Sequence, residues 1–215
     1  MSTKTNRRFL GGVVFAPFAV WAFLTPARAE SVPTPPTATT TLVSPAKPER
    51  ASVFGDSITD SAVTQGRIAN AARDDRLQVS WETAPYLSTY HFQSGFDEAG
   101  VNQPDVVIIA TGTNDAKEKI GAVQASSIDN ALDALAGNPC VAWVNVRSEI
   151  GPNHVLWNQL LTAKASAAGN VRVADWDEYS NGHQEWIHPD NVHLSDEGKV
   201  AYAKWLVDQM VLGCP

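Results

Sequence analysis

Short runs of apolar residues alternate along this chain with segments in which apolar positions recur every three to four residues. The continuous runs predict strands, and the recurring positions predict helices. The strands are predicted at residues 51–54, 77–81, 105–111, 140–146 and 171–176. The helices are predicted at residues 63–74, 120–136, 155–168 and 195–211. Alternation of this kind predicts an α/β fold, in which helices connect the strands of one sheet.

The third predicted strand indicates how the sheet is built. Val106-Val107-Ile108-Ile109 is apolar at every position instead of at every second one. This pattern is typical of a strand covered on both faces, as in a parallel sheet. We therefore expect residues 51–215 to form one domain, a three-layer α/β/α sandwich with a flavodoxin-like sheet of five parallel strands.

The first 29 residues have the composition of a secretory signal peptide. A basic start is followed by an uncharged run, residues 9–24, and then by the small residues of a cleavage site, Ala27-Arg28-Ala29. The uncharged run is shorter than the roughly 20 residues that a membrane-spanning helix needs. We expect cleavage after Ala29, a secreted or cell-envelope location and no stable membrane insertion.

A stretch rich in Pro and Thr, residues 30–50, separates this leader from the predicted domain. It lacks apolar periodicity, so we expect a linker. The chain has 16 Lys+Arg and 23 Asp+Glu, and four of the basic residues but none of the acidic ones precede residue 30. Cleavage would leave 12 basic and 23 acidic residues, a net charge of −11. We therefore expect no binding to nucleic acid, which needs clustered Lys and Arg.

Four polar residues lie where the predicted strands end. Ser57 follows the first strand, Asn114 follows the third, and Asp190 and His193 lie between the fifth strand and the last helix. Ligand sites in parallel sheets lie at the carboxyl ends of the strands, so we expect these residues at one edge. A serine on a tight strand-to-helix turn can be a nucleophile, but it can also be a helix cap.

Three motifs in this order resemble the SGNH, or GDSL-type, hydrolase family. Gly55-Asp56-Ser57-Ile58-Thr59 is similar to its first block, Gly112-Thr113-Asn114-Asp115 to its third, and Asp190-x-x-His193 to its last. The resemblance implies that Ser57 is the nucleophile, that His193 is the general base and that Asp190 orients it. It also implies that Asn114 and the N–H of Ser57 bind the oxyanion.

The family's second block contains a glycine that supplies a further oxyanion N–H, and its counterpart in this chain is uncertain from the sequence. Gly95 is the one glycine between Gly66 and Gly100. Either Gly95 supplies this N–H, or a residue near Tyr86 does, or the chain departs from the family pattern.

Further residues are expected around the site. We expect Asp56 and Trp186 to contact the substrate, and Asp115 to serve a turn or a helix cap. The three histidines near Asp190 match no compact zinc-ligand spacing, so we expect no metal and no cofactor.

The two cysteines, Cys140 and Cys214, form an even pair in a chain expected to be exported. One precedes the fourth strand and the other follows the last helix, so both should lie at the end of the sheet opposite the active site. We expect a structural disulfide between them.

The sequence thus predicts a monomeric secreted esterase that cleaves small-acyl carboxylic esters through an acyl-enzyme. Its substrate would be a small-molecule, lipid or carbohydrate ester. Two alternatives stay open. One is a cell-wall carbohydrate O-acetyltransferase or deacetylase, and the other is a non-catalytic carbohydrate-binding domain.

Overall fold

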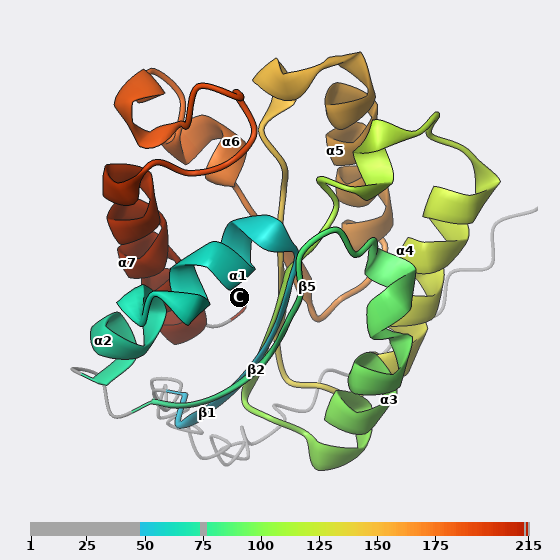
Figure 1. The fold of residues 1–215 in the computed structure, drawn as a ribbon. Helices are drawn as coiled ribbons and strands as arrows, with labels where there is room; N and C mark the ends of the chain where they lie inside the picture. Colours follow the sequence, from blue (N-terminus) through green and yellow to red (C-terminus); the bar gives the residue numbers. More distant parts are fainter. Residues whose placement is uncertain (1–47, 74–76, 213, 215) are drawn as a thin grey trace, which may run out of the picture. The chain divides into compact units, whose positions relative to one another are not determined.

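A five-stranded parallel sheet forms the centre of the domain in the computed structural model (Figure 1). The structure describes residues 48–73, 77–212 and 214, which all belong to the compact unit Val43–Pro215. The predicted signal peptide and most of the linker lie outside the described residues. The strand order is β2-β1-β3-β4-β5, so the predicted flavodoxin-like α/β fold is confirmed. The strands are β1 (Arg50–Gly55), β2 (Gln78–Thr83), β3 (Val106–Ala110), β4 (Val141–Val144) and β5 (Val171–Ala174).

Helices cover both faces of this sheet, as Figure 1 shows. One layer packs on the first face: α1 (Ser57–Thr64), α2 (Arg67–Arg73) and α7 (Asp196–Leu212). The other layer packs on the second face: α3 (Gln93–Asn102), α4 (Ala122–Ala134) and α5 (Pro152–Ala165). The shorter elements are α6 (Trp176–Tyr179), η1 (Thr89–Phe92), η2 (Asp115–Lys117), η3 (Ser148–Ile150) and η4 (Gln184–Trp186).

Side chains from the two faces of each central strand pack in two separate hydrophobic clusters. In β3, Ile108 packs with the α1, α2 and α7 layer, whereas Ile109 packs with the α3, α4 and α5 layer. Every residue of β3 and β4 is buried, as expected for strands covered on both sides. Strand β2 lies at the edge and is partly exposed along its length. The sheet is therefore a rigid base for the loops at its carboxyl edge.

Three local predictions differ from the structure. The first predicted helix is two helices, because Gly66 takes a left-handed conformation (φ 68°) and breaks the chain between α1 and α2. Helix α3 was not predicted, since Gly95 and Gly100 weaken its helical pattern. Strand β5 ends at Ala174, and Trp176 begins helix α6 instead of ending the strand.

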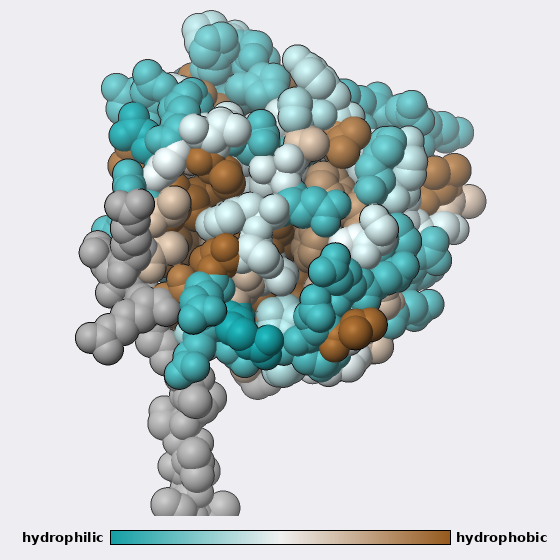
Figure 2. All heavy atoms as spheres, turned by 60° about the horizontal axis from the view of Figure 1, so that its bottom comes forward, coloured by the Kyte–Doolittle hydropathy of each residue, from teal (hydrophilic) through white to brown (hydrophobic). Residues whose placement is uncertain are grey.

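The predicted disulfide between Cys140 and Cys214 is present, with Cα atoms 5.2 Å apart. It joins the start of β4 to the chain that follows α7, at the end of the sheet away from the loops after β1 and β3. On the face seen in Figure 2, hydrophobic residues form small separate areas among polar ones. Within the described part of the chain, each helix is too short or too polar to cross a membrane.

Candidate active site

The turn that follows β1 places Ser57 at the first position of α1. A Cβ on Gly55 would collide with the side chain of Thr59, so this close approach requires glycine. Asp56 occupies the N-cap position and accepts the N–H of Ile58 at 3.1 Å. Because Asp56 caps the helix, the hydroxyl of Ser57 is available for another partner.

The carboxylate of Asp56 also ties this turn to the loop after β3. It accepts the N–H of Thr113 at 3.2 Å, and the N–H of Asp56 donates to the carbonyl of Ala110 at 3.2 Å. Burial raises the pKa of Asp56 from 3.8 to about 6, although the hydrogen bonds from Ile58 and Thr113 act in the opposite direction. Asp56 therefore fixes Ser57 beside Thr113 and Asn114, which are neighbours in the chain.

The loop before α7 is closed on itself. Ile187 and Leu194 form an antiparallel bridge, and the N–H of His188 donates to the carbonyl of His193 at 2.8 Å. Asn191 takes a left-handed conformation (φ 60°), which asparagine tolerates better than most residues. The result is a compact loop, residues 187–194, which we call the catalytic loop.

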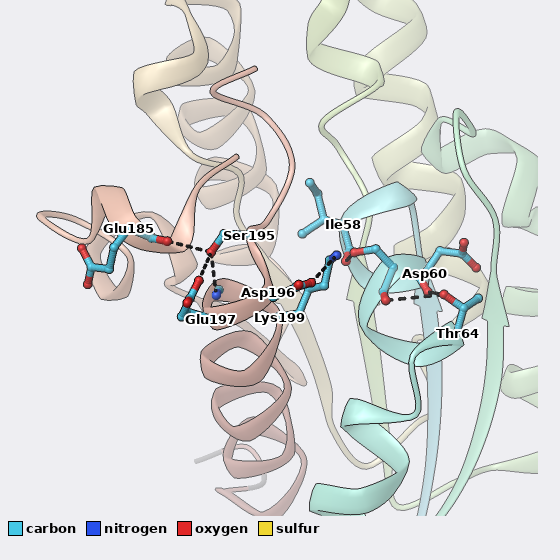
Figure 3. Close-up of polar contacts among 10 residues, drawn as sticks. Ile58, Asp60, Thr64, Glu185, Ser195, Asp196, Glu197 and Lys199 are labelled. Carbon is cyan, nitrogen blue, oxygen red and sulfur yellow. Dashed lines mark hydrogen bonds and ion pairs between the residues drawn. The ribbon is translucent and has the colours of Figure 1, made fainter. Parts of the chain in front are cut away.

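Helix α7 anchors the catalytic loop at its far end, as Figure 3 shows. Ser195 accepts the N–H of Gly198 at 3.1 Å, and its hydroxyl donates to the carbonyl of Glu185 at 2.6 Å. The N–H of Ser195 donates to the carbonyl of Trp186 at 2.8 Å. Gly198 lies against this same carbonyl, and a Cβ there would overlap it. The first turn of α7 therefore holds the loop in one position.

Ser57, His193 and Asp190 form a continuous hydrogen-bonded chain. The Nε2 atom of His193 lies 3.2 Å from the Oγ of Ser57, and its Nδ1 lies 2.8 Å from the Oδ2 of Asp190. The side chains of His193 and Asp190 are each 41% exposed, so the chain of residues opens to solvent. This is the geometry of a nucleophile, a base and a carboxylate that orients the base.

The hydrogen bonds of Asp190 keep its carboxylate ionised and determine the tautomer of His193. Its Oδ1 accepts the N–H groups of Val192 and His193, each at 2.9 Å. Slight burial raises the pKa of Asp190. The hydrogen bonds from the His193 side chain and from these N–H groups have the larger combined effect, so the pKa lies well below its usual value. The carboxylate is therefore ionised at neutral pH. It favours the His193 tautomer with hydrogen on Nδ1, which leaves Nε2 free to accept the Ser57 proton.

Asn114 lies in the loop after β3 with its amide held at both ends. Its Nδ2 donates to the carbonyl of Leu87 at 3.0 Å, and its Oδ1 accepts from the ammonium of Lys117 at 2.7 Å. An amide nitrogen carries two hydrogens, so a second N–H is left for a ligand. The N–H of Ser57 is at the first position of α1, where it has no partner within the helix.

Comparisons with solved structures identify the fold. A carbohydrate esterase family 3 protein from Talaromyces cellulolyticus has a TM-score of 0.59 at 16% identity, over 76% of this chain and 96% of that one. A candidate lipolytic protein of the G-D-S-L family from Desulfitobacterium hafniense has a TM-score of 0.58 at 16% identity, over 74% and 98%. The chain has the SGNH (GDSL-type) hydrolase fold.

Other matches agree with this SGNH fold. A mutant of Axe2, an acetylxylan esterase from Geobacillus stearothermophilus, has a TM-score of 0.58 at 16% identity, over 75% of this chain and 94% of that one. In sequence, the chain is 34% identical over 98 residues to a candidate O-acetyltransferase of Staphylococcus aureus. That match covers 45% of this chain and only 15% of the relative. No family model matches the chain.

Gly95, expected as one possible oxyanion donor, lies in the first turn of α3. It packs against the ring of Phe54 and the carboxyl group of Glu82, and it lines a hollow over β1 and β2. The structure thus does not bring Gly95 to the residues around Ser57. Tyr86 and Leu87 are placed differently, because the carbonyl of Leu87 holds the amide of Asn114. In this SGNH fold, the segment after β2 therefore reaches the site through Tyr86 and Leu87.

Trp186, expected to line the cleft, packs in an aromatic cluster beside the catalytic loop. Its ring stacks on His183 with centroids 3.7 Å apart and lies 6.2 Å from the ring of Trp176. His183 is in turn bonded to Glu185 at 2.7 Å. Trp186 therefore packs in an aromatic cluster, and it is not among the residues that line the cavity beside Ser57.

A small cavity lies between the turn after β1, which carries Ser57, and the catalytic loop. It has a volume of about 20 Å³ and is bounded by residues that flank Ser57 and His193, namely Asp56, Ile58 and Val192. Arg147, buried and paired with Glu149, forms part of the opposite wall. A volume of this size accepts one or two water-sized groups. The cavity therefore has room for a group about the size of a methyl.

Several residues near the site serve its structure. Asp115 is buried, and its carboxylate accepts the N–H of Thr89 at 2.9 Å and the hydroxyl of Thr89 at 3.0 Å. It thereby joins the loop after β3 to the segment after β2. His188 approaches Asp190 at 3.4 Å. In the part of the chain that the structure describes, no group of three or more His, Cys, Asp and Glu side chains is arranged to hold a metal ion.

The sequence did not point to Leu87 or Lys117. Leu87 is 27 residues from Asn114, and such a distant contact leaves no local pattern. Lys117 is three residues from Asn114, which is one turn of the short helix η2. If η2 had been predicted from the sequence, the three-residue spacing would have placed Lys117 beside Asn114.

Proposed function

We propose that this protein is a serine esterase of the SGNH family that hydrolyses small-acyl esters, acetyl esters above all, through an acyl-enzyme on Ser57. One observation carries the proposal: the continuous chain of contacts from Ser57 through His193 to Asp190, with distances of 3.2 and 2.8 Å. The esterase neighbours with the same fold support it.

The first half of the reaction forms the acyl-enzyme. The Oγ of Ser57 attacks the ester carbonyl carbon while Nε2 of His193 takes the hydroxyl proton. Negative charge develops on the carbonyl oxygen, where the second N–H of Asn114 and the N–H of Ser57 would stabilise it. The intermediate collapses as the bond to the alkoxy oxygen breaks, and His193 returns the proton to the departing alcohol.

Water completes the cycle. It enters as the alcohol leaves, and His193 removes one of its protons while the water oxygen attacks the acyl carbon. Collapse of the second intermediate releases the carboxylic acid and restores the hydroxyl of Ser57. Asp190 stays ionised throughout and stabilises the imidazolium that forms in each half. The residues present account for every proton, so the proposed reaction uses no cofactor.

Hydrolysis of p-nitrophenyl acetate by residues 30–215 tests the proposal. Ser57→Ala should lose at least about 10⁴-fold in kcat. Ser61→Ala is the matched control, because Ser61 lies on the same helix but its hydroxyl is bonded to the carbonyl of Ile58 at 2.8 Å. Equal activity of the wild-type protein and Ser57→Ala would refute the acyl-enzyme. Inactivity of both would favour the carbohydrate-binding alternative.

The size of the cavity indicates which acyl chain length the substrate has. A volume of about 20 Å³ favours an acetyl group over longer acyl chains. We expect kcat/KM to fall from p-nitrophenyl acetate to the butyrate and the octanoate. A rise along this series would contradict an acetyl-sized acyl site.

Acyl transfer is the second candidate function, and the Staphylococcus aureus relative named as a candidate O-acetyltransferase favours it. In this reaction a sugar hydroxyl would replace water in the second half. Adding a carbohydrate acceptor to the p-nitrophenyl acetate assay separates the two. Acetylated sugar formed at the expense of acetate would establish transfer, whereas acetate alone would establish hydrolysis.

We propose further that the protein is exported and monomeric. The basic start, the uncharged run and the disulfide support export, since disulfides persist in oxidising compartments. Amino-terminal sequencing of protein recovered from outside the cytoplasm should begin at Glu30. Light scattering should give the mass of one chain.

A further inference from the structure

Lys117 makes an unusual contact for an exposed lysine. Its ammonium lies 2.7 Å from the Oδ1 of Asn114, the residue proposed above as an oxyanion donor. Lys117 is the last residue of η2, and its backbone N–H donates to the carbonyl of Asn114 at 3.2 Å. Both the backbone and the side chain of Lys117 are therefore directed to one residue.

This contact determines which way the amide of Asn114 faces. An ammonium group only donates hydrogen bonds, so the atom that faces it must be the amide oxygen. The carbonyl of Leu87 only accepts, so the atom that faces it, at 3.0 Å, must be the amide nitrogen. The two partners agree on a single orientation. Without Lys117, only the bond to Leu87 would hold the amide.

The charge of Lys117 adds a second effect. A cation at the oxygen of an amide draws electron density from its nitrogen, which makes the N–H groups stronger donors. The oxyanion exists only in the tetrahedral intermediate and its transition states. A stronger donor there increases the rate of the chemical step with little effect on substrate binding.

Tyr86 covers Lys117 from the solvent side. The ammonium lies 6.0 Å from the centre of the Tyr86 ring, a distance at which a cation is attracted to the aromatic face. Tyr86 holds a left-handed conformation (φ 66°) that is costly for a residue with a bulky side chain, and it is 77% exposed. An exposed tyrosine in a strained conformation gains little from burial. The cation–π contact with Lys117 is one interaction that its ring makes.

We propose that Lys117 is a positioning residue that orients and polarises the Asn114 amide in the oxyanion hole, with the ring of Tyr86 holding its ammonium in place. This inference rests on the proposed esterase function. It assigns Lys117 no contact with the substrate. The motifs that mark the active site in the sequence do not include Lys117 or Tyr86.

Kinetics of Lys117→Met on p-nitrophenyl acetate test this role. We expect kcat to fall about tenfold with KM unchanged, which is less than the roughly 10²- to 10³-fold expected for loss of an oxyanion donor. Lys117→Arg keeps a charged donor and should recover kcat to within about threefold of the wild-type value. Lys119→Met is the matched control, because Lys119 is exposed on the same loop and its loss changes the net charge equally.

Two kinetic outcomes would overturn the proposal. One is a kcat of Lys117→Met equal to that of Lys119→Met, which would reduce the effect to net charge. The other is a rise in KM at unchanged kcat, which would make Lys117 a substrate contact. If the wild-type protein were inactive, the proposed esterase function would be contradicted instead.

An NMR measurement, which needs no turnover, tests the proposal whether or not the wild-type protein is active. In ¹⁵N-labelled wild-type protein, the side-chain NH₂ signals of Asn114 are those absent from Asn114→Ala. Lys117→Met should shift these signals, and Lys119→Met should leave them in place. Unshifted Asn114 signals in folded Lys117→Met would contradict the proposed contact.

Discussion

The catalytic loop and the oxyanion side of the site are built in opposite ways. The catalytic loop is exposed, and its bonds join residues within a few positions of one another, as Asp190 and His193 show. On the Asn114 side, proposed to bind the oxyanion, the buried residues Asn114 and Asp115 also bond to distant segments, at Leu87 and Thr89, in addition to the local bond of Lys117 to Asn114. Local bonds can be read from short sequence spacing, whereas distant ones depend on the whole fold.

The two sides also differ in their ionisable groups. The carboxylate of Asp190 lies in the open and accepts several hydrogen bonds, which hold its pKa well below the usual value despite slight burial. The carboxyl of Asp56 lies in the interior, where burial raises its pKa to about 6. The carboxylate of Asp190 is thus ionised near the surface, where we propose that it orients His193, whereas the carboxyl of Asp56 bonds the backbone beneath it.

The largest effect should come from the catalytic loop. Asp190→Asn keeps the size of the side chain but removes its charge, so it should lower kcat by about 10⁴-fold, because the His193 tautomer and imidazolium lose their support. Steady-state kinetics on p-nitrophenyl acetate measure this. Asp196→Asn, an exposed acid in the first turn of α7, is the control and should retain activity. A loss below tenfold in Asp190→Asn would remove Asp190 from the proposed catalytic set.

A smaller effect should come from the oxyanion side. Asn114→Ala removes one donor to the oxyanion and should lower kcat by about 10²- to 10³-fold with KM nearly unchanged. Asn153→Ala provides the comparison, since Asn153 is half-buried and its amide nitrogen donates to the carbonyl of Glu118 at 2.8 Å. If Asn114→Ala instead raised KM at constant kcat, Asn114 would bind the substrate and not the transition state.

The smallest effect concerns stability and the buried carboxyl. Because the folded-state pKa of Asp56 is raised from 3.8 to about 6, the folded protein binds more protons than the unfolded chain between these values. The contribution of Asp56 to stability is therefore greatest below about pH 4. It falls by about 3 kcal/mol as the pH rises to about 6, at 1.36 kcal/mol per pKa unit.

Denaturant unfolding of the wild-type protein and Asp56→Asn at pH 4 and pH 7 measures this contribution. Asp56→Asn does not ionise, so its stability relative to the wild-type protein should increase by about 2 kcal/mol from pH 4 to pH 7, because part of the total change already lies below pH 4. The comparison of the two proteins cancels the titration of other groups. A difference that stays constant with pH would mean that Asp56 ionises as easily in the folded state as in the unfolded chain.

The sequence was informative where the physical cause is local or repeated. Continuous apolar runs such as Val106 to Ile109 arise directly from burial on both faces, so the parallel sheet could be predicted. The spacing of Asp190 and His193 needs only one short loop. The pairing of Cys140 with Cys214 followed from the side of the sheet on which each was expected.

The sequence was less informative where a residue is defined by its distant neighbours. Gly95 was a candidate donor because it is a glycine, but its lack of a side chain serves the close packing of α3 on Phe54. Trp186 was expected to contact the substrate, but its ring packs against other aromatic residues, among them His183 and Trp176. The contact of Leu87 with Asn114 joins segments whose approach depends on the packed fold.

Trapping of the acyl-enzyme tests the central claim most directly. The wild-type protein is mixed with p-nitrophenyl acetate, quenched in acid within the first turnover, and digested for mass spectrometry. The account predicts one added acetyl group, on the hydroxyl of Ser57, in the wild-type protein and in Ser61→Ala, and none at this peptide in Ser57→Ala. Acetate production without acetylation of Ser57, or the same activity in Ser57→Ala, would contradict it.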